Sequence, residues 1–348
     1  MDIIAYLEAF LGLDYHSTSI QVCVLDPQGN VLGNRSIPND VTSLVEFVDK
    51  VAPGRVVRRG ALEACCGAAN LAEQLRALGW DICLAHAGLC SRMKQNPDKS
   101  DLSDAHLLAD LMRVGYLPRV WLPPQEIRDL RRLVRYRTQL AEQRRDLKLR
   151  IRALLREERI QVPDEAGNVW TKAWLRWLGA TTALGSHTRW VMDQHLAGLE
   201  RVVSELKNVE QRMKETTRDD QITKRLIAEK GIGLVTAVTF RAEIGSFDRF
   251  RCGKQLARYC AVTPRNASTG KRQADAGLIK AGNLPLRTLL IEAAHRLGRF
   301  SPKWKAMKAR LKQARKPAGV IAAAIANRWV RQLYWQFQQP QSDPSVAA

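Results

Sequence analysis

Four carboxylates stand at positions from which they could hold divalent metal ions together. Asp14 and Glu63 each close a strand-like run, and Asp101 and Asp104 open a helical pattern. Side chains three residues apart on a helix share a face, so the two aspartates would point the same way. Carboxylate oxygens are the ligands that Mg2+ prefers. Two magnesium ions held by this set would orient an attacking oxygen and offset the charge on a phosphate under displacement.

Each of these acids also has an interpretation without catalysis. Asp14 could face solvent at its strand end, and Glu63 could pair with Arg58 or Arg59. The two aspartates of the helical pattern could serve as an N-cap and a first-turn acid, which the helix dipole favours. The joint placement at two strand ends and one helix start favours the metal site.

The elements around these acids follow the order strand, strand, strand, helix, strand, helix, strand, helix. The expected strands are residues 9–15, 20–26, 31–36, 56–63 and 81–85, and the expected helices are residues 41–51, 68–78 and 102–114. A meander followed by alternating helices and strands predicts a ribonuclease-H-like α/β fold, in which the first and fourth strands are neighbours. Asp14 and Glu63 would then meet at one sheet edge. Sugar-kinase and actin-like ATPase folds begin with the same order.

A long helical segment follows three prolines at positions 118, 123 and 124. Residues 125–160 carry leucines at 133, 140, 147 and 154, a seven-residue repeat that requires a partner helix. A second helix at about residues 190–216 has its own apolar stripe, so we expect an antiparallel pair within the chain or across a dimer. Trp170, Trp174 and Trp177 lie between the helices at helical spacing, which favours a packed core over base stacking.

These boundaries predict an α/β protein with an all-α second half. We expect a ribonuclease-H-like domain at residues 1–124, a coiled-coil helical segment at 125–220 and a small, mainly helical domain at 221–348.

The charge is distributed unevenly between the two halves. The chain has a net charge of +20. Residues 1–124 hold 11 Lys+Arg and 14 Asp+Glu, whereas residues 125–348 hold 44 and 21. A mildly acidic half suits a carboxylate metal site, and a strongly cationic half suits a polyanion, because phosphate contacts dominate nucleic-acid affinity.

Cysteines, histidines and hydropathy indicate the compartment. The seven cysteines form no Cys-x-x-Cys pair and the six histidines are scattered, which argues against a zinc enzyme and for reduced thiols. The N-terminus lacks a basic leader and a cleavage site, and no apolar run approaches the roughly 18 residues of a membrane span. We therefore expect a cytoplasmic protein without membrane contact.

Two blocks of motifs resemble one family, the DEDD-type insertion-sequence transposases related to the Piv site-specific invertases. The resemblance covers nearly the whole chain. The first block comprises Gly12-Leu13-Asp14, Leu62-Glu63-Ala64 and the run from Lys99 to Ala105. The second comprises Gly231-Ile232-Gly233, Phe247 with Phe250, Gln255-Leu256-Ala257, Thr263-Pro264, Ser268-Thr269-Gly270, Lys280 with Gly282-Asn283, and Leu286-Arg287.

The resemblance implies a division of the chemistry between two domains. A RuvC-like N-terminal domain would bind Mg2+ through Asp14, Glu63, Asp101 and Asp104. A C-terminal transposase domain would supply a serine that attacks DNA and forms a covalent phosphoserine link. We assign Ser268 as this nucleophile. In some relatives the serine directly precedes the glycine, a place that Thr269 holds here, so either hydroxyl could be the attacking group.

The hydroxyl loop could not act alone. A hydroxyl is a weak nucleophile until its proton is removed or a metal lowers its pKa, and this loop contains no histidine. Its chemistry would require docking against the carboxylate site of its own or another subunit. Arg265, Lys271 and Arg272 would steady the scissile phosphate, and we also assign Lys280 and Arg287 to nucleic-acid binding.

The family comparison also implies partners. Besides DNA at the element ends and the target, a structured noncoding guide RNA is expected, together with assembly as a dimer or tetramer. The main alternative is a RuvC-like metal-dependent endonuclease or junction resolvase without a covalent intermediate. A non-catalytic nucleic-acid-binding relative and an actin-like phosphotransferase are further alternatives, although the N-terminal half lacks glycine-rich phosphate loops.

Overall fold

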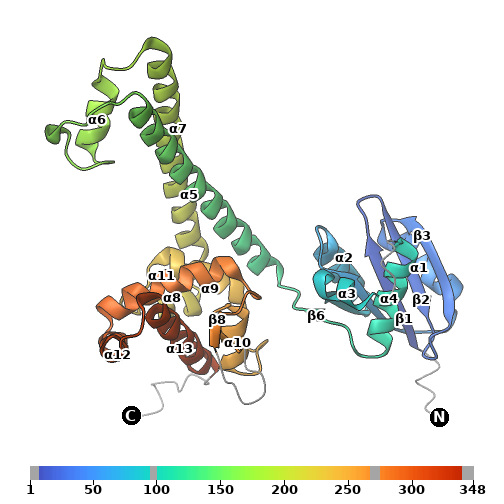
Figure 1. Cartoon of the computed structure of the whole chain (residues 1–348). Helices are drawn as coiled ribbons and strands as arrows, with labels where there is room; N and C mark the ends of the chain where they lie inside the picture. The colour runs from blue at the N-terminus through green and yellow to red at the C-terminus, as the bar shows by residue number, and fades with distance from the viewer. Residues whose placement is uncertain (1–7, 95–99, 267–274, 339–348) are drawn as a thin grey trace. The chain divides into compact units, whose positions relative to one another are not determined.

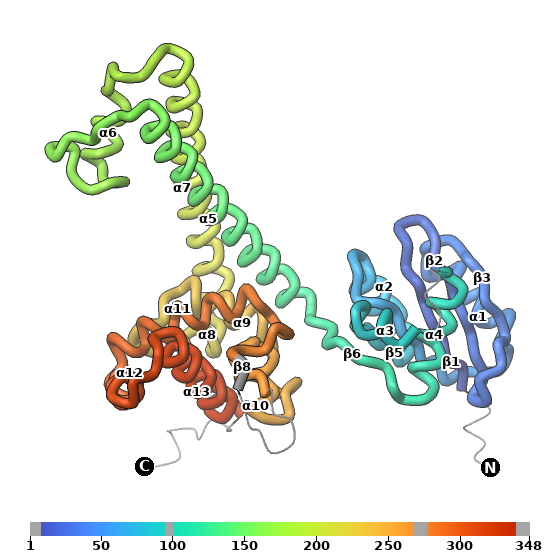
Figure 2. The backbone as a smooth tube through the Cα atoms, in the orientation of Figure 1, coloured from blue at the N-terminus to red at the C-terminus, as the bar shows by residue number. Residues whose placement is uncertain are grey.

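The computed structural model describes residues 8–94, 100–266 and 275–338, and of residues 275 and 276 it describes the backbone only. The chain divides into two compact units, with the boundary in the sequence between Leu122 and Pro123 (Figures 1 and 2). Among the described residues, no helix combines the length and the apolar character that crossing a membrane requires.

A mixed β-sheet forms the centre of the first unit. Its strands are β1 (Glu8–Tyr15), β2 (Ser19–Leu25), β3 (Val31–Pro38), β4 (Val57–Glu63), β5 (Asp81–Ala85) and β6 (Arg119–Val120), in the order β3-β2-β1-β4-β5-β6. The first three strands pair antiparallel, β1, β4 and β5 run parallel, and β6 is antiparallel to β5. The five longer strands agree with the sequence prediction to within two residues, whereas β6 was not predicted.

Helices cover both faces of this sheet. The first helix, α1 (Val41–Val51), and α2 (Ala68–Ala77) bury Leu44, Leu71 and Leu75 against one face. Helices α3 (Ala87–Met93) and α4 (Asp101–Arg113) bury Cys90 and Leu108 against the other. The result is a three-layer α/β/α arrangement, which gives both faces of the parallel strands an apolar cover.

One glycine allows α4 to lie unusually close to the central strand. A Cβ atom placed on Gly12 of β1 would come 1.8 Å from the carbonyl oxygen of Ala105 and 2.6 Å from the amide nitrogen of Ala109. Both atoms belong to the α4 backbone and cannot rotate away. The missing side chain at Gly12 therefore sets the distance between α4 and the end of β1.

The second unit begins with a long helical hairpin. Helix α5 (Gln125–Glu157) and α7 (Ser186–Thr216) lie side by side and antiparallel (Figure 1). Leu140 packs on Val202 and Leu206 along their seam. Arg137, at a position where the repeat would favour an apolar side chain, bonds Glu210 through Nη2 at 2.8 Å. The antiparallel pair expected from the sequence thus forms within one chain.

The hairpin tip contains the tryptophan cluster. The short η2 (Asp164–Ala166) and α6 (Lys172–Ala180) lie between the two long helices in sequence. Trp174 is buried, and its ring centroid lies 4.7 Å from that of Trp170 and 6.0 Å from that of Trp177. The prediction of a packed aromatic core is confirmed.

The remainder of the second unit is a helical domain around its own core. It contains α8 (Gln221–Ile227), α9 (Leu234–Ile244), α10 (Gly253–Tyr259), α11 (Leu284–Phe300), α12 (Pro302–Gln313) and α13 (Ala318–Gln338), with β7 (Pro264–Asn266) pairing antiparallel to β8 (Asp275–Leu278). Phe240 and Trp329 lie at the centre of this core, and the Trp329 indole donates a 2.8 Å hydrogen bond to Glu229. The base of the hairpin joins the domain through Leu130 and Val134, which pack on Val238.

Candidate metal centre

Two of the four acids are placed by neighbouring parallel strands. In the register of β1 and β4, Leu13 lies opposite Leu62. The next residues, Asp14 and Glu63, therefore follow at the same edge of the sheet. The residues directly before them, 9–13 in β1 and 60–62 in β4, are buried, whereas both carboxylates are partly exposed at the strand ends.

The other two acids come from the first turn of α4. Ser100 is the N-cap, and its carbonyl accepts a 2.9 Å hydrogen bond from the Asp104 amide. Asp101 and Asp104 lie in the turn that follows, on the helix that passes close over Gly12. The two aspartates are first-turn acids, as the alternative interpretation held, but the cap is the serine before them.

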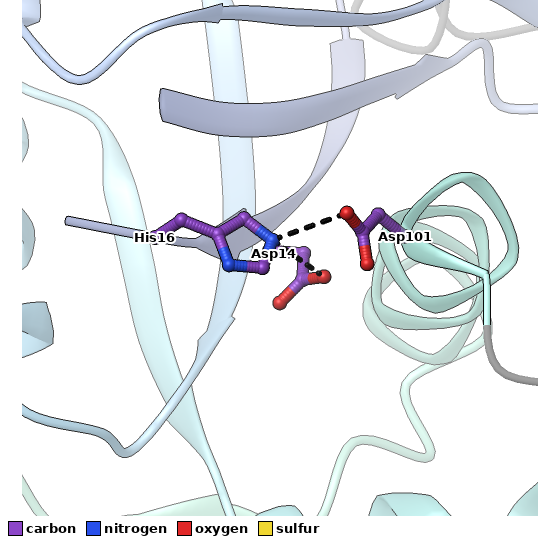
Figure 3. Close-up of side chains that lie close together, drawn as sticks. All are labelled: Asp14, His16 and Asp101. Carbon is purple, nitrogen blue, oxygen red and sulfur yellow. Dashed lines mark ion pairs between the residues drawn. The ribbon is translucent and has the colours of Figure 1, made fainter. Parts of the chain in front are cut away.

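A histidine joins this group of acids. His16 Nε2 lies 3.5 Å from Asp14 Oδ2 and 3.3 Å from Asp101 Oδ2, and Figure 3 shows this nitrogen facing both carboxylates. One ligand atom of each of these three residues lies within 4.8 Å of the others. The side chains come from β1, the turn after it and α4, so three separate segments build the cluster.

A lysine contacts the fourth acid. Lys94, which directly follows α3, places Nζ 2.5 Å from Asp104 Oδ1. Both side chains are mostly buried. The ammonium supplies one positive charge that acts on Asp14 and Glu63 as well.

Burial and like charge raise the pKa values of two acids in the cluster. Burial raises the pKa of Asp14 above its ordinary value, His16 lowers it, and the charges of Asp101 and Asp104 raise it further. Burial also raises the pKa of Glu63, and Asp14 and Asp104 add to the effect. All four acids thus appear in one set of mutual interactions, in which ionisation of one opposes ionisation of another.

The donor set fits a divalent cation. Carboxylate oxygens predominate, and a bound cation would favour the ionised forms of Asp14 and Glu63, whose pKa values are raised by burial and by neighbouring acids. The alternative partners of Glu63 are engaged elsewhere, because Arg58 pairs with Asp49, and Arg59 pairs with Glu8 at 3.0 Å.

The residues assigned to nucleic-acid chemistry are only partly described. Ser268, Thr269, Lys271 and Arg272 lie outside the described residues. Arg265 in β7 and Lys280 after β8 are exposed. Arg287 is half-buried, and its Nη1 donates a 3.0 Å hydrogen bond to the Ile279 carbonyl, which gives this arginine a role in the fold.

Two residues of the cluster, His16 and Lys94, were not predicted from the sequence. A signal for His16 was present, since residues two apart along a strand face the same side and His16 stands two after Asp14. Lys94 had no comparable signal, because the short helix that positions it was not predicted.

Comparison with protein families gives two matches. A family model described as a transposase, of the DEDD type of IS110 elements, matches residues 11–159. A second, described as the transposase of the IS116/IS110/IS902 family, matches residues 223–309. The first match includes all four acids, and the second includes the β7 and β8 strands.

Curated proteins are similar over most of their own length. A Pseudomonas aeruginosa protein named "Probable family 20 transposase" is 28% identical over 333 residues, which cover 93% of this chain and 95% of that protein. The transposase for insertion sequence element IS1111A of Coxiella burnetii is 26% identical over 82% of this chain and 77% of its own length. The transposase for insertion sequence element IS1328 of Yersinia enterocolitica is 22% identical over 92% of this chain and 94% of its own length.

Proposed function

Because this chain carries the two transposase domains of the IS110/IS116/IS902 family, we propose that it cuts and rejoins the DNA strands of a mobile element. The observation that carries the proposal is the grouping of Asp14 and Asp101 with His16 within 4.8 Å, with Glu63 at the end of the neighbouring strand and Asp104 in the same helical turn as Asp101. Like charges repel, so a fold that concentrates four of them at one edge is suited to binding a cation.

The strand order supports a ribonuclease-H-like, RuvC-like identity for the first unit. A meander of β1 to β3 joins the parallel β4 and β5 through β1, and the acids lie where β1 and β4 end. This arrangement agrees with the fold expected from the sequence, in which the first and fourth strands are neighbours. We infer that the active centre of the enzyme is built on this sheet.

Magnesium is the ion that we assign to this centre. Bound Mg2+ would neutralise charge on the phosphate and lower the pKa of an attacking hydroxyl. Asp14, Glu63, Asp101 and Asp104 would hold it through carboxylate oxygens. Lys94 pairs with the Asp104 carboxylate and would help to orient it.

We further propose that Ser268 is the nucleophile. Its Oγ would form a bond to the DNA phosphorus while the bond from phosphorus to the leaving oxygen breaks, and the hydroxyl proton would pass to solvent. The leaving oxygen keeps the electron pair of the broken bond, and the phosphate remains attached to the serine. Thr269 is the alternative hydroxyl. The exposed Arg265 beside this loop supports a phosphate-binding role for the segment.

The charge of the second unit supports a nucleic-acid partner. Residues 125–348 hold 44 Lys+Arg against 21 Asp+Glu, an excess that suits DNA and also a structured noncoding guide RNA. We propose both partners, with assembly as a homodimer or homotetramer, because several strands must be cut in one complex.

A covalent-trapping experiment tests the proposal. Purified protein is incubated with element-end DNA, the RNA of the element and Mg2+, and protein–DNA adducts are separated under denaturing conditions. We expect an adduct with wild-type protein and none with Ser268→Ala. Loss of the adduct in Thr269→Ala but not in Ser268→Ala would instead identify Thr269 as the nucleophile.

The same assay tests the metal centre. Asp14→Ala should lower DNA cleavage by on the order of 100-fold or more with DNA affinity unchanged. Glu46→Ala, which removes an exposed acid from α1, is the matched control and should cleave normally. Metal-dependent cleavage without any adduct would instead favour the endonuclease or resolvase alternative, and unchanged cleavage by Asp14→Ala would contradict both.

A further inference from the structure

Two hydrogen bonds of its backbone hold His16 in the turn after β1, one through the amide and one through the carbonyl. The His16 amide donates a 2.9 Å hydrogen bond to the Ser19 carbonyl. The His16 carbonyl accepts a 2.7 Å hydrogen bond from Asn39 Nδ2. These bonds fix the residue at the strand end, and they leave the imidazole without any part in the turn. The ring position is therefore set by the side-chain contacts of the imidazole and not by the turn.

The imidazole Nε2 faces two carboxylates at ion-pair distance, without a hydrogen bond to either (Figure 3). Nitrogen donors usually approach oxygen to about 2.7–3.2 Å. The distances from Nε2 to Asp14 and Asp101 are 3.5 and 3.3 Å, and the described residues offer the ring no other ionic partner. Its side chain is 44% exposed, so burial does not account for its placement either.

These separations match the spacing of ligands around one ion. Two ligand atoms about 2.1 Å from an ion, at right angles to each other, lie about 3 Å apart. The separations of 3.5 and 3.3 Å are slightly wider than this, and the three ligand atoms remain within 4.8 Å of one another. A small inward movement of the side chains would bring one nitrogen and two oxygens onto a single cation.

We propose that His16 Nε2 is a ligand of the divalent ion, beside Asp14 and Asp101, and that it gives the centre a preference for Mn2+ over Mg2+. Carboxylates suit Mg2+ and Mn2+ alike, whereas an imidazole nitrogen favours transition metals. The ligand nitrogen would carry the lone pair and Nδ1 the proton. The inference rests on the proposed metal centre and specifies its ligands; Mg2+ remains able to bind through the oxygens.

Pulsed electron paramagnetic resonance of bound Mn2+ tests this ligand directly. The full-length protein, free of a polyhistidine tag, is loaded with Mn2+ and probed for coupling to an imidazole 14N nucleus. We expect this coupling in wild-type protein and in His106→Gln, which changes an exposed histidine on α4. We expect no coupling in His16→Gln.

Binding titrations give a second readout. The ratio of the Mg2+ to the Mn2+ dissociation constant should fall about tenfold in His16→Gln, with the folded state checked by circular dichroism. Bound Mn2+ without nitrogen coupling in wild-type protein, or coupling that persists in His16→Gln, would overturn the His16 assignment and leave the carboxylate centre intact. Failure of wild-type protein to bind either ion would overturn the metal centre itself.

Discussion

In the first unit, acidic side chains are concentrated at one edge of a sheet, whereas in the second unit cationic side chains are distributed over exposed helix surfaces. The acid cluster draws on β1, β4 and α4, and burial together with the neighbouring acids raises the pKa values of Asp14 and Glu63. Helix α12 shows the opposite arrangement. Its five cations are exposed, and none pairs with a carboxylate in the described part of the chain: Lys303, Lys305, Lys308, Arg310 and Lys312.

The difference shows which charged groups depend on tertiary structure for their placement. Four acids come close together only where strand register and helix position are maintained, and each ionised group there raises the free energy of ionising the next. Cations that are spread over a helix surface remain hydrated, and their placement requires only that the helix forms. A site for chemistry therefore depends on the tertiary structure of the first unit, whereas a surface for a polyanion depends mainly on composition.

The largest expected effect comes from filling the space at Gly12. Gly12→Val would push β1 and the α4 backbone apart, because the first added carbon already meets Ala105 at 1.8 Å. We expect a loss of about 3 kcal/mol or more in the stability of the first unit, with the helical second unit still folded. Thermal unfolding with limited proteolysis of each unit would measure this.

Gly88→Ala is the matched control. A Cβ there meets the His86 side chain no closer than 3.5 Å, an ordinary contact. This variant should unfold close to the wild-type temperature. Equal destabilisation by both substitutions would show that the close approach of α4 to Gly12 does not limit the stability of the first unit.

An intermediate effect is expected from the cations of α12. Replacing Lys305, Lys308 and Arg310 by glutamine should weaken DNA binding by about tenfold or more. The plot of the logarithm of the binding constant against the logarithm of the salt concentration should also become shallower, by up to about 0.9 in slope for each phosphate that is no longer neutralised. Binding isotherms at several salt concentrations measure both quantities. Lys50→Gln, which removes an exposed cation from α1, should leave the slope unchanged. A similar loss of affinity in both variants would mean that net charge alone governs binding.

The smallest expected effect is a gain in stability. Because burial and neighbouring acids raise the pKa of Asp14, its ionised form destabilises the metal-free fold at pH values above that raised pKa. Asp14→Asn should therefore raise the Tm of the first unit by a few degrees near pH 8, where the difference is largest. The gain should disappear as the pH falls below the ordinary aspartate pKa, since the wild-type carboxyl is then protonated in both states.

Calorimetry at several pH values measures this gain. Asp49→Asn serves as the control, because Asp49 lies outside the cluster and pairs with Arg58. A lower Tm for Asp14→Asn at every pH would show that attraction to His16 outweighs repulsion among the acids.

Much of the first unit could be predicted because its strands and helices have distinct periodicities. Alternating and continuous apolar runs marked β1 to β5, and the acids at the ends of β1 and β4 followed from parallel pairing of neighbouring strands. That Asp14 and Asp101 lie close together could be expected only on the assumption of a ribonuclease-H-like fold, because they are far apart in the sequence. The sequence does not show how closely α4 approaches β1, which depends on the absence of a side chain at Gly12.

The residues missed by prediction are those whose positions depend on turns and short elements. His16 belongs to a turn fixed by Ser19 and Asn39, and Lys94 follows a seven-residue helix too short to show clear periodicity. In the second unit, repeat leucines predicted the helical pair. The pairing of Arg137 with Glu210 across it could not be anticipated, because that contact joins residues far apart in sequence.

The attachment of α5 at its base has a mechanical consequence. Arg131 donates hydrogen bonds of 2.8 and 2.9 Å to the carbonyls of Ala242 and Glu243, where α9 ends, so the first turns of α5 are fastened to the helical domain. The 33-residue helix extends about 50 Å at about 1.5 Å per residue. A tilt of about 5° at this fastening would displace the far end by about 4 Å, so the hairpin converts small rearrangements of the domain into large displacements of the tryptophan cluster.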